Sequence, residues 1–285
     1  MLTHVKAFWL NHVPALTSFP RFDLLHLTQQ QPVLRRRLAP RVLLTIHDVN
    51  FFHNGLRPAD VRRKAARIDR MLRVATHLSY ISQFTQQDIH QHFPVTQPER
   101  VIRNGVTRHD TLSAHQPSGQ LPAKYLLVLS GWDRKKNVDE IVAMMSCLPD
   151  KQLVVAGNGK AEDHVRLQAI INRLHLTNVT LLGRVSEAVN SWLCQHCEAF
   201  LFTSRSEGFG LPPAEAMTCG KPVFLSQSTS LPEVGGEAAF YFPDLTPETM
   251  AATLRDGLAQ WYSHEDEHRQ AVLTQVAQFN WDDAV

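Results

Sequence analysis

The sequence predicts an α/β protein with two domains, each built on a parallel sheet. Short apolar runs rich in β-branched residues alternate with helix-length segments along most of the 285 residues. A polar stretch rich in Pro, Gly and Ser, residues 110–123, interrupts this alternation and is typical of a linker. Charge also differs between the two sides, because residues 1–120 contain 16 Lys and Arg against 7 Asp and Glu, and residues 121–285 contain 13 against 20. We therefore expect one domain over residues 1–115 and another over residues 116–285.

The composition indicates a soluble globular protein, with 44% hydrophobic and 20% charged residues. Because the sequence contains no run of eighteen apolar residues, we expect no membrane-spanning helix. The first residues, MLTHVKAFWLNHVPAL, lack a clear secretory signal pattern. Four cysteines without regular spacing favour a reducing compartment. We expect a cytoplasmic protein, with attachment to the inner face of the membrane left open.

The first domain is expected to alternate strands and helices around one apolar run. Arg41–Ile46 is a β-branched run that ends in the polar pair His47-Asp48, as a buried parallel strand does at its carboxyl end. The next elements are expected to be a helix at 60–75, a strand at 77–82, a helix at 86–92 and a turn at Asn104-Gly105.

The second domain repeats the alternation more regularly, which predicts helices on both faces of a parallel sheet. Strands are expected at 125–129, 153–156, 179–182, 199–202 and 222–225, and helices at 138–146, 162–174, 187–196, 213–219 and 247–262. Ligands of such folds bind where the carboxyl ends of the strands converge, and we expect a cleft between the two domains there.

Basic residues are concentrated in the first domain, at 35–37, at Arg41 and along 62–73. A solvated helix face explains such a run equally well as attraction to an anionic membrane leaflet or a lipid phosphate. Nucleic acid is disfavoured, because no aromatic residues are interleaved and no known binding module is present.

The stretch SEGFGLPPAEAM, residues 206–217, contains the strongest site signal. Gly208 and Gly210 permit close backbone approach to a ligand, and the prolines after them suit the start of a helix. Free amides of Phe209, Gly210 and Leu211 at that positive helix end would bind a phosphate. Two acids, Glu207 and Glu215, flank the turn, and a carboxylate suits the vicinal diol of a sugar or ribose. The alternative is that Glu207 is a loop charge and that Glu215, expected in the first helical turn, is favoured there by the helix dipole.

Two further candidates lie at strand ends. Arg134, Lys135 and Lys136 follow the strand at 125–129, where cations would neutralise a departing diphosphate, although a plain surface loop is the alternative. His47 at the end of its strand could donate to a sugar hydroxyl or phosphate, or be one structural histidine among fifteen.

Other patterns are not interpreted as sites. Gly157-Asn-Gly159 lacks the third glycine of a dinucleotide-binding loop, and Cys194-x-x-Cys197 lacks a partner pair at zinc spacing. No Asp-x-Asp pair occurs that could hold a metal on a diphosphate. We therefore expect no metal and no cofactor.

The motifs together resemble those of the family 4 retaining glycosyltransferases, also called group 1 glycosyltransferases, over roughly residues 40–285. The resemblance is carried by Glu207-Gly-Phe-Gly-Leu-Pro-Pro-Ala-Glu215, by Lys135-Lys136-Asn137, by Thr45-Ile-His47, by Asn104-Gly105-Val106 and by Ser230-Leu-Pro-Glu-Val-Gly-Gly236. It implies the GT-B fold, in which two Rossmann-like domains face a cleft.

The resemblance also implies roles for individual residues. Glu207 would contact the donor hexose, Glu215 the nucleotide ribose, and Lys136 a phosphate. The amides of Phe209, Gly210 and Leu211 would hold the diphosphate or sugar, Arg134 and Lys135 would assist, His47 would be catalytic, and His26 and Asn104 would line the site.

Several positions depart from the family pattern. Thr107 replaces an aspartate, and the arginine that usually precedes the lysine motif falls near Ser130 and Gly131, so that Arg134 would substitute for it. His47 comes early and no Gly-Gly loop precedes it, and the chain stops at Val285, before the family's final helix. We therefore expect an incomplete N-terminal domain in a chain shortened at both ends.

The resemblance implies metal-independent transfer of a hexose, with mannose as a candidate, and with retention of configuration. The donor would be a GDP- or UDP-sugar, and the acceptor a saccharide or lipid-linked molecule of surface polysaccharide or lipopolysaccharide synthesis. A nucleotide-sugar-binding remnant without turnover is the main alternative, and a GT-B epimerase or phosphorylase is a third.

Overall fold

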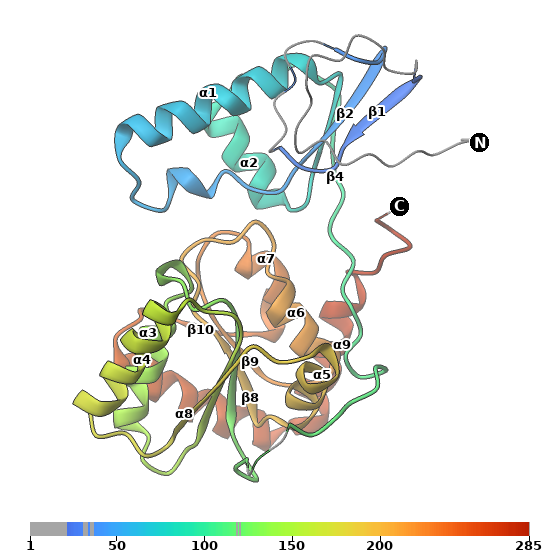
Figure 1. Cartoon of the computed structure of the whole chain (residues 1–285). Coiled ribbons are helices and arrows are strands. Elements are labelled where there is room, and N and C mark those ends of the chain that lie inside the picture. The colour runs from blue at the N-terminus through green and yellow to red at the C-terminus, as the bar shows by residue number, and fades with distance from the viewer. Residues whose placement is uncertain (1–21, 31–33, 35–36, 118, 120, 285) are drawn as a thin grey trace. The chain divides into compact units, whose positions relative to one another are not determined.

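The computed structural model describes residues 22–30, 34, 37–117, 119 and 121–284 and divides into two compact units (Figure 1). The first unit takes the described residues of Met1–Ile81 and Thr85–Ile102. The second takes those of Ser82–Phe84 and Arg103–Val285. The apolar opening of the sequence and the basic residues Arg35 and Arg36 lie outside the described residues.

The first unit is a four-stranded parallel sheet in the order β1-β2-β3-β4. Its elements are β1 (Leu24–Leu27), β2 (Arg41–Ile46), the short helix η1 (Asn50–Phe52), α1 (Pro58–Val74), β3 (His77–Tyr80), α2 (Gln83–His92) and β4 (Glu99–Val101). Along β2 the side chains of Val42, Leu44 and Ile46 are buried, while the intervening residues are not fully covered. α1 covers this apolar row with Ile68 and Met71, because these positions lie one turn apart on one helix face.

The second unit is a six-stranded parallel sheet in the order β10-β9-β8-β5-β6-β7. Its strands are β5 (Leu126–Leu129), β6 (Leu153–Ala156), β7 (Val179–Gly183), β8 (Ala199–Phe202), β9 (Val223–Ser226) and β10 (Phe240–Phe242). Its helices are η2 (Arg134–Lys136), α3 (Val138–Met144), η3 (Met145–Cys147), α4 (Ala161–Arg173), α5 (Glu187–His196), α6 (Leu211–Thr218), α7 (Leu231–Gly235), η4 (Gly236–Ala238), α8 (Pro247–Ser263) and α9 (Glu265–Ala277).

The strand order of the second sheet fixes the place where a ligand can bind. The chain adds β6 and β7 on one side of β5, then returns to add β8, β9 and β10 on the other side. The direction of winding therefore switches between β5 and β8, which is the point in doubly wound sheets where the connecting loops diverge and leave a crevice. The segments after β5 and after β8 meet at this point.

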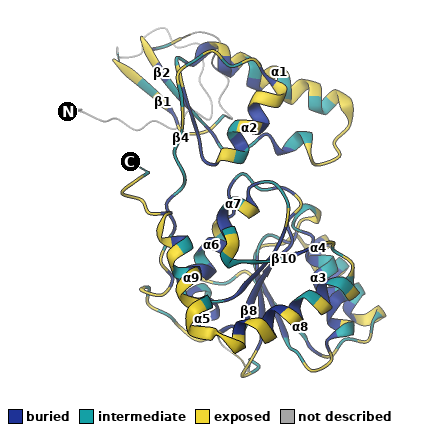
Figure 2. Cartoon of the chain, turned by 180° about the vertical axis from the view of Figure 1, so that it is seen from behind, coloured by how far each residue is buried: buried dark blue, intermediate teal, exposed yellow. Residues whose placement is uncertain are grey.

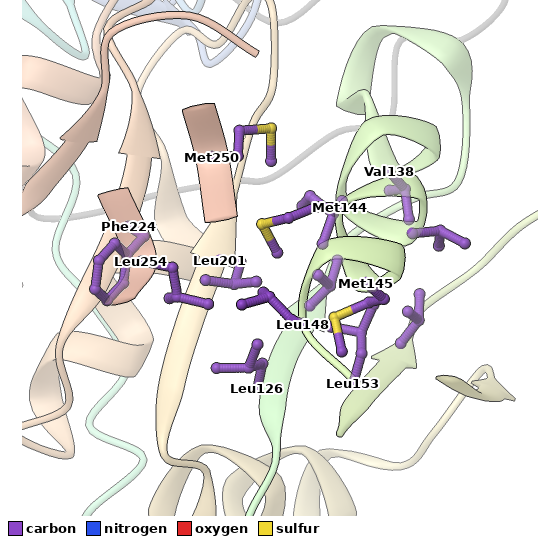
Figure 3. Close-up of a cluster of buried hydrophobic side chains, with 14 of the residues drawn as sticks. Leu126, Val138, Met144, Met145, Leu148, Leu153, Leu201, Phe224, Met250 and Leu254 are labelled. Carbon is purple, nitrogen blue, oxygen red and sulfur yellow. The ribbon is translucent and has the colours of Figure 1, made fainter. Parts of the chain in front are cut away.

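Helices cover both faces of the second sheet, which explains why its central strands are apolar throughout. Figure 1 shows α3, α4 and α8 on one face and α5, α6, α7 and α9 on the other. Figure 2 shows the strands between them as buried, and every residue of β5, β6, β8 and β9 is buried. On the α3 side the core joins Leu126 and Leu201 of the sheet to Met144 of α3 and Leu254 of α8 (Figure 3).

The structure confirms the predicted class of two parallel-sheet α/β domains, and it adds elements that the sequence pattern did not indicate. The additions are β1, β4, β10, α7 and α9, together with the four short helices η1 to η4. Three of them are strands of three or four residues, and α9 is polar on most of its surface, with only Val272 and Val276 buried. Such short or polar segments lack the periodicity on which the sequence prediction depends.

Residues 103–117 pack with the second unit, so the division between the two units, after Ile102, lies N-terminal to the linker expected at 110–123. Val106 and His109 are buried there, and the His115 amide donates to the Ala188 carbonyl at 3.0 Å. Asn104-Gly105, expected to form a turn, is an irregular segment without one. Gly105 is needed there for close approach, because a Cβ atom would overlap the Trp281 side chain.

Candidate functional site

The loop after β5 presents three cations on one short helix. Asp133 begins η2, and its carboxylate accepts a hydrogen bond from the Lys135 amide at 3.2 Å. Asn137 ends η2 in a left-handed conformation, with φ of 55°, and this reversal lets α3 start at once. Arg134 is exposed, whereas the side chain of Lys136 is mostly covered.

The loop after β8 is tied to the loop after β5 by side chains that converge on Asn137. The Arg205 guanidinium donates to the Asn137 side-chain oxygen from Nε at 3.2 Å and from Nη2 at 2.9 Å. The Thr203 hydroxyl donates to the Asn137 carbonyl at 3.1 Å, and the Arg205 amide donates to the Lys135 carbonyl at 2.8 Å. The two loops at the switch point are therefore held in one arrangement.

The central pair of the site is Lys136 and Glu207. The Lys136 ammonium lies 2.5 Å from Glu207 Oε1, and their side chains are only 15% and 13% exposed. The same ammonium lies 5.4 Å from the centre of the Phe202 ring. The Glu207 amide donates to the Thr229 hydroxyl at 2.9 Å, so the backbone that carries the carboxylate is also fixed. A cation and an anion thus lie in contact at the switch point, each with an opposite charge that a ligand can replace.

The start of α6 offers amides to a ligand. Gly210 caps the helix with φ of 117°, and a Cβ atom there would lie 2.9 Å from the Leu231 side chain. The amides of Phe209, Gly210 and Leu211 have no hydrogen-bond partner in the part of the chain that the structure describes. Pro212 and Pro213 bring no N–H of their own. These amides lie at a positive helix end, where the sequence analysis expects a phosphate to bind.

A pocket of about 410 Å³ lies within the second unit, next to this helix. It is lined by Thr107, His109, Leu129, Ser130, Gly157, Asn158, Arg184, Val185, Ser186, Glu187, Asn190, Pro212 and Glu215. Gly157 has φ of +140°, and a Cβ atom there would overlap the Ser130 carbonyl, so glycine lets the ends of β5 and β6 meet at the pocket wall.

Glu215 lies in this pocket, with its side chain 22% exposed, but not in the first turn of α6 as expected. The helix begins at Leu211, two residues before the expected start, and its first turn contains no acid. Glu215 therefore gains little from the helix dipole, which acts within the first turn. The helix-dipole explanation of Glu215 is wrong, and its place in the pocket favours a ligand-binding role.

The sequence-predicted residues of the first unit lie near one sheet edge. His47 follows β2, and its Nε2 donates to the Thr28 carbonyl at 2.8 Å, while His26 Nε2 lies 2.8 Å from the Thr45 hydroxyl. Asn104 belongs to the second unit and is half-buried. The structure therefore assembles Lys136, Glu207 and the α6 amides in the second unit, and holds the two histidines in the first.

Sequence reasoning missed His109, which the structure places in the pocket wall. Its side chain is 3% exposed, and its Nε2 lies 3.6 Å from Glu215 Oε2. The residue is close in sequence to Asn104-Gly105-Val106, but its partners lie on α5 and α6, far along the chain. No local sequence signal points to it.

No described helix is both long enough and apolar enough to cross a membrane. Within the same residues, no group of three or more His, Cys, Asp or Glu side chains is arranged to hold a metal ion.

Known proteins are similar to this chain in sequence and in fold. O-antigen chain mannosyltransferase B of Escherichia coli is 27% identical over 262 residues, which cover 85% of this chain and 67% of that protein. GDP-mannose:cellobiosyl-diphosphopolyprenol alpha-mannosyltransferase of Xanthomonas campestris is 26% identical over 190 residues, 64% of this chain and 49% of that protein. The chain thus spans about two thirds and about half of these two relatives.

Among solved structures, sucrose-phosphate synthase from Thermosynechococcus elongatus matches with a TM-score of 0.76 at 20% identity, over 92% of this chain and 71% of that one. This likeness confirms the predicted GT-B class of fold. Residues 114–272 match the family described as Glycosyl transferases group 1, and this match takes in both glutamates and the lysine cluster. The chain belongs to the group 1 glycosyl transferases.

Proposed function

We propose that the chain transfers a hexose, with mannose as the first candidate, from a nucleotide-diphosphate sugar to a saccharide or lipid-linked acceptor of surface polysaccharide synthesis. The observation that carries the proposal is the Lys136–Glu207 ion pair at the switch point, beside the amides at the start of α6 that have no partner among the described residues. A cation and free amides suit a diphosphate, and a carboxylate next to them suits the hydroxyls of the attached sugar.

In this proposal each part of the donor binds to its own group of residues. The diphosphate is bound by the Lys136 ammonium and by the amides of Phe209, Gly210 and Leu211. Arg134 and Lys135 add positive charge from η2. Glu207, released from Lys136, accepts hydrogen bonds from the hexose, and Glu215 accepts them from the ribose in the pocket. As the glycosidic phosphate bond breaks, negative charge grows on the diphosphate, where these donors stabilise it. In this proposal His47 donates to the sugar or phosphate, and the transfer retains the anomeric configuration without metal.

The curated relatives supply the choice of sugar and acceptor. Both are mannosyltransferases, and the name of one specifies GDP-mannose and a polyprenol-linked acceptor. We therefore place GDP-mannose first among donors, with UDP-sugars as the other outcome of the test.

The first unit is proposed to hold the acceptor near an anionic membrane surface. α1 exposes six cations, namely Arg62, Arg63, Lys64, Arg67, Arg70 and Arg73. Asp60 pairs with Arg63 and Asp69 with Arg73, whereas Arg62, Arg67 and Arg70 have no ion pair among the described residues. These cations face solvent, where acidic headgroups attract them without insertion of the helix.

A thermal-shift screen of the full chain against GDP, UDP, ADP and their sugars identifies the donor. A nucleotide at a hundred times its Kd stabilises by about 2.7 kcal/mol, which a melting curve resolves. Release of nucleotide from the bound donor with polyprenol-linked saccharides then tests transfer, with Glu207→Gln as the inactive control. Proton NMR of the product gives its anomeric configuration, and an inverted product would refute retention.

The alternative of a binding remnant predicts a different combination of results. The same nucleotide shifts the melting curve, but no donor in the panel releases nucleotide with any acceptor. If no nucleotide shifts the melting curve, both the transferase hypothesis and the remnant hypothesis are contradicted. For the membrane arm, co-sedimentation with vesicles containing acidic lipids is expected to fall when Arg67 and Arg70 are replaced by Glu, and unchanged binding would refute it.

A further inference from the structure

His109 lies outside any helix or strand, yet hydrogen bonds fix both its backbone and its side chain. Its amide donates to the Thr218 hydroxyl on α6 at 3.1 Å, and its carbonyl accepts from the Gln195 side chain on α5 at 2.6 Å. Its imidazole Nδ1 lies 2.7 Å from the Ser191 hydroxyl, also on α5. Backbone and ring are thus fixed against two helices, and the ring is left with one free edge.

The partners of Ser191 determine which nitrogen of His109 carries the proton. The Ser191 hydroxyl donates its single hydrogen to the Glu187 carbonyl at 3.0 Å. It can therefore only accept from His109, so Nδ1 is the protonated nitrogen of the neutral ring. Nε2 of the neutral ring is then a hydrogen-bond acceptor.

This acceptor lies beside another acceptor. Nε2 is 3.6 Å from Glu215 Oε2, beyond hydrogen-bond distance, and no hydrogen bond to Nε2 is found among the described residues. Both side chains line the 410 Å³ pocket. With a neutral His109 ring these are two neighbouring acceptors, which a ligand that brings two donors satisfies, whereas a protonated ring would pair with Glu215 directly. Vicinal hydroxyls are such a pair of donors, because each donates one hydrogen and the two oxygens lie about one hydrogen-bond length apart.

We propose that His109 Nε2 and Glu215 form a two-acceptor clamp for the two ribose hydroxyls of the nucleotide, with one hydroxyl donating to each side chain. The inference rests on the proposed function, and it assigns to His109 a direct part in selecting a ribonucleotide. Ser191 acts as a positioning residue, because it holds the tautomer that leaves Nε2 able to accept.

The test measures the affinity of the full chain for GDP, 2′-deoxy-GDP and 3′-deoxy-GDP by calorimetry, with the uridine series in parallel. The matched variant is His109→Asn, which keeps an N–H donor toward Ser191 and lacks the Nε2 acceptor. For the wild-type chain, loss of the hydroxyl that faces His109 weakens binding about three- to tenfold, as expected for one neutral hydrogen bond.

His109→Asn is expected to bind the ribonucleotide weaker by the same factor and to stop distinguishing it from that one deoxy analogue. Discrimination at the other hydroxyl remains, because Glu215 is intact. If His109→Asn still discriminates at both hydroxyls as the wild type does, the inference is overturned. A merely structural role would weaken the three nucleotides equally, and that result also overturns it.

A second variant covers the case in which His109→Asn does not fold. Ser191→Ala is nearly isosteric and removes the acceptor for Nδ1–H, so the ring can place its hydrogen on Nε2 toward Glu215. The same single-hydroxyl discrimination is then expected to shrink, and full retention would overturn the inference. If wild type binds neither nucleotide series, the proposed function fails and the inference falls with it. If wild type binds and transfers sugar while both variants discriminate normally, the inference alone fails.

Discussion

Removing one charge of the Lys136–Glu207 pair is predicted to cost more stability than removing both. The perturbations are Glu207→Gln, Lys136→Met and the double variant. Exposed ion pairs contribute about 0–1 kcal/mol, and loss of one partner of a fully buried pair costs about 3–5 kcal/mol. With side chains only 15% and 13% exposed and a 2.5 Å separation, this pair lies between those limits.

We expect each single variant to lower the free energy of unfolding of the second unit by about 2 kcal/mol, with a coupling energy of similar size. Glu207→Gln leaves the ammonium over Phe202 without its anion, and Lys136→Met leaves a covered carboxylate without its cation. The double variant is expected to be more stable than either single one, because no unpaired charge remains.

Urea unfolding followed by tryptophan fluorescence measures these energies. The described tryptophans all belong to the second unit, namely Trp132, Trp192, Trp261 and Trp281. The matched control is the Lys160–Glu162 pair, at 3.5 Å and with side chains 81% and 74% exposed, for which coupling near zero is expected. A coupling energy for Lys136 and Glu207 as small as that of the control pair would refute the reasoning.

Three further predictions concern packing and titration in the second unit. Gly157→Ala forces a Cβ atom into the Ser130 carbonyl at φ of +140°, so thermal melting should show a larger loss than for Gly183→Ala, which has φ of +69° and open space; equal losses would contradict the steric argument. Leu201→Ala empties part of a buried cluster and should lower the free energy of urea unfolding by about 2–5 kcal/mol, and a change under 1 kcal/mol would show that the site collapses. Burial raises the pKa of Cys219 to about 11, so its unfolded thiol ionises first, and the free energy of unfolding should fall between about pH 8.5 and pH 11. Cys219→Ala should flatten that fall by about 1.4 kcal/mol per pH unit in urea titrations, and an unchanged slope would count against the assignment.

The fold was predictable wherever an element is an apolar run of four or more residues with clear polar boundaries. β2, β6 and β8 were predicted with the bounds that the structure shows, because each is a short apolar run between polar breaks. β4 and β10 were not, since three residues give no period. α9 was also missed, because its few buried side chains are diluted among charges.

The site was predictable only as far as its residues are local in sequence. The stretch around Glu207 and the cluster at Lys136 each contain their own signal, but no pattern in the sequence states that the two side chains touch. His109 shows the limit most clearly, since its partners Ser191 and Glu215 become neighbours only when α5 and α6 pack. Contacts of this kind depend on tertiary structure and not on local periodicity.

The convergence of Arg205 and Thr203 on Asn137 has a thermodynamic consequence for substrate capture. An incoming ligand that must first order a loop loses about 0.5–1.5 kcal/mol of affinity for each long side chain that it immobilises. Here the hydrogen bonds to Asn137 have already ordered both loops before any ligand arrives. Binding of a diphosphate to these ordered loops therefore costs little conformational entropy. The free energy of its contacts can then stabilise the transition state, in which charge separates.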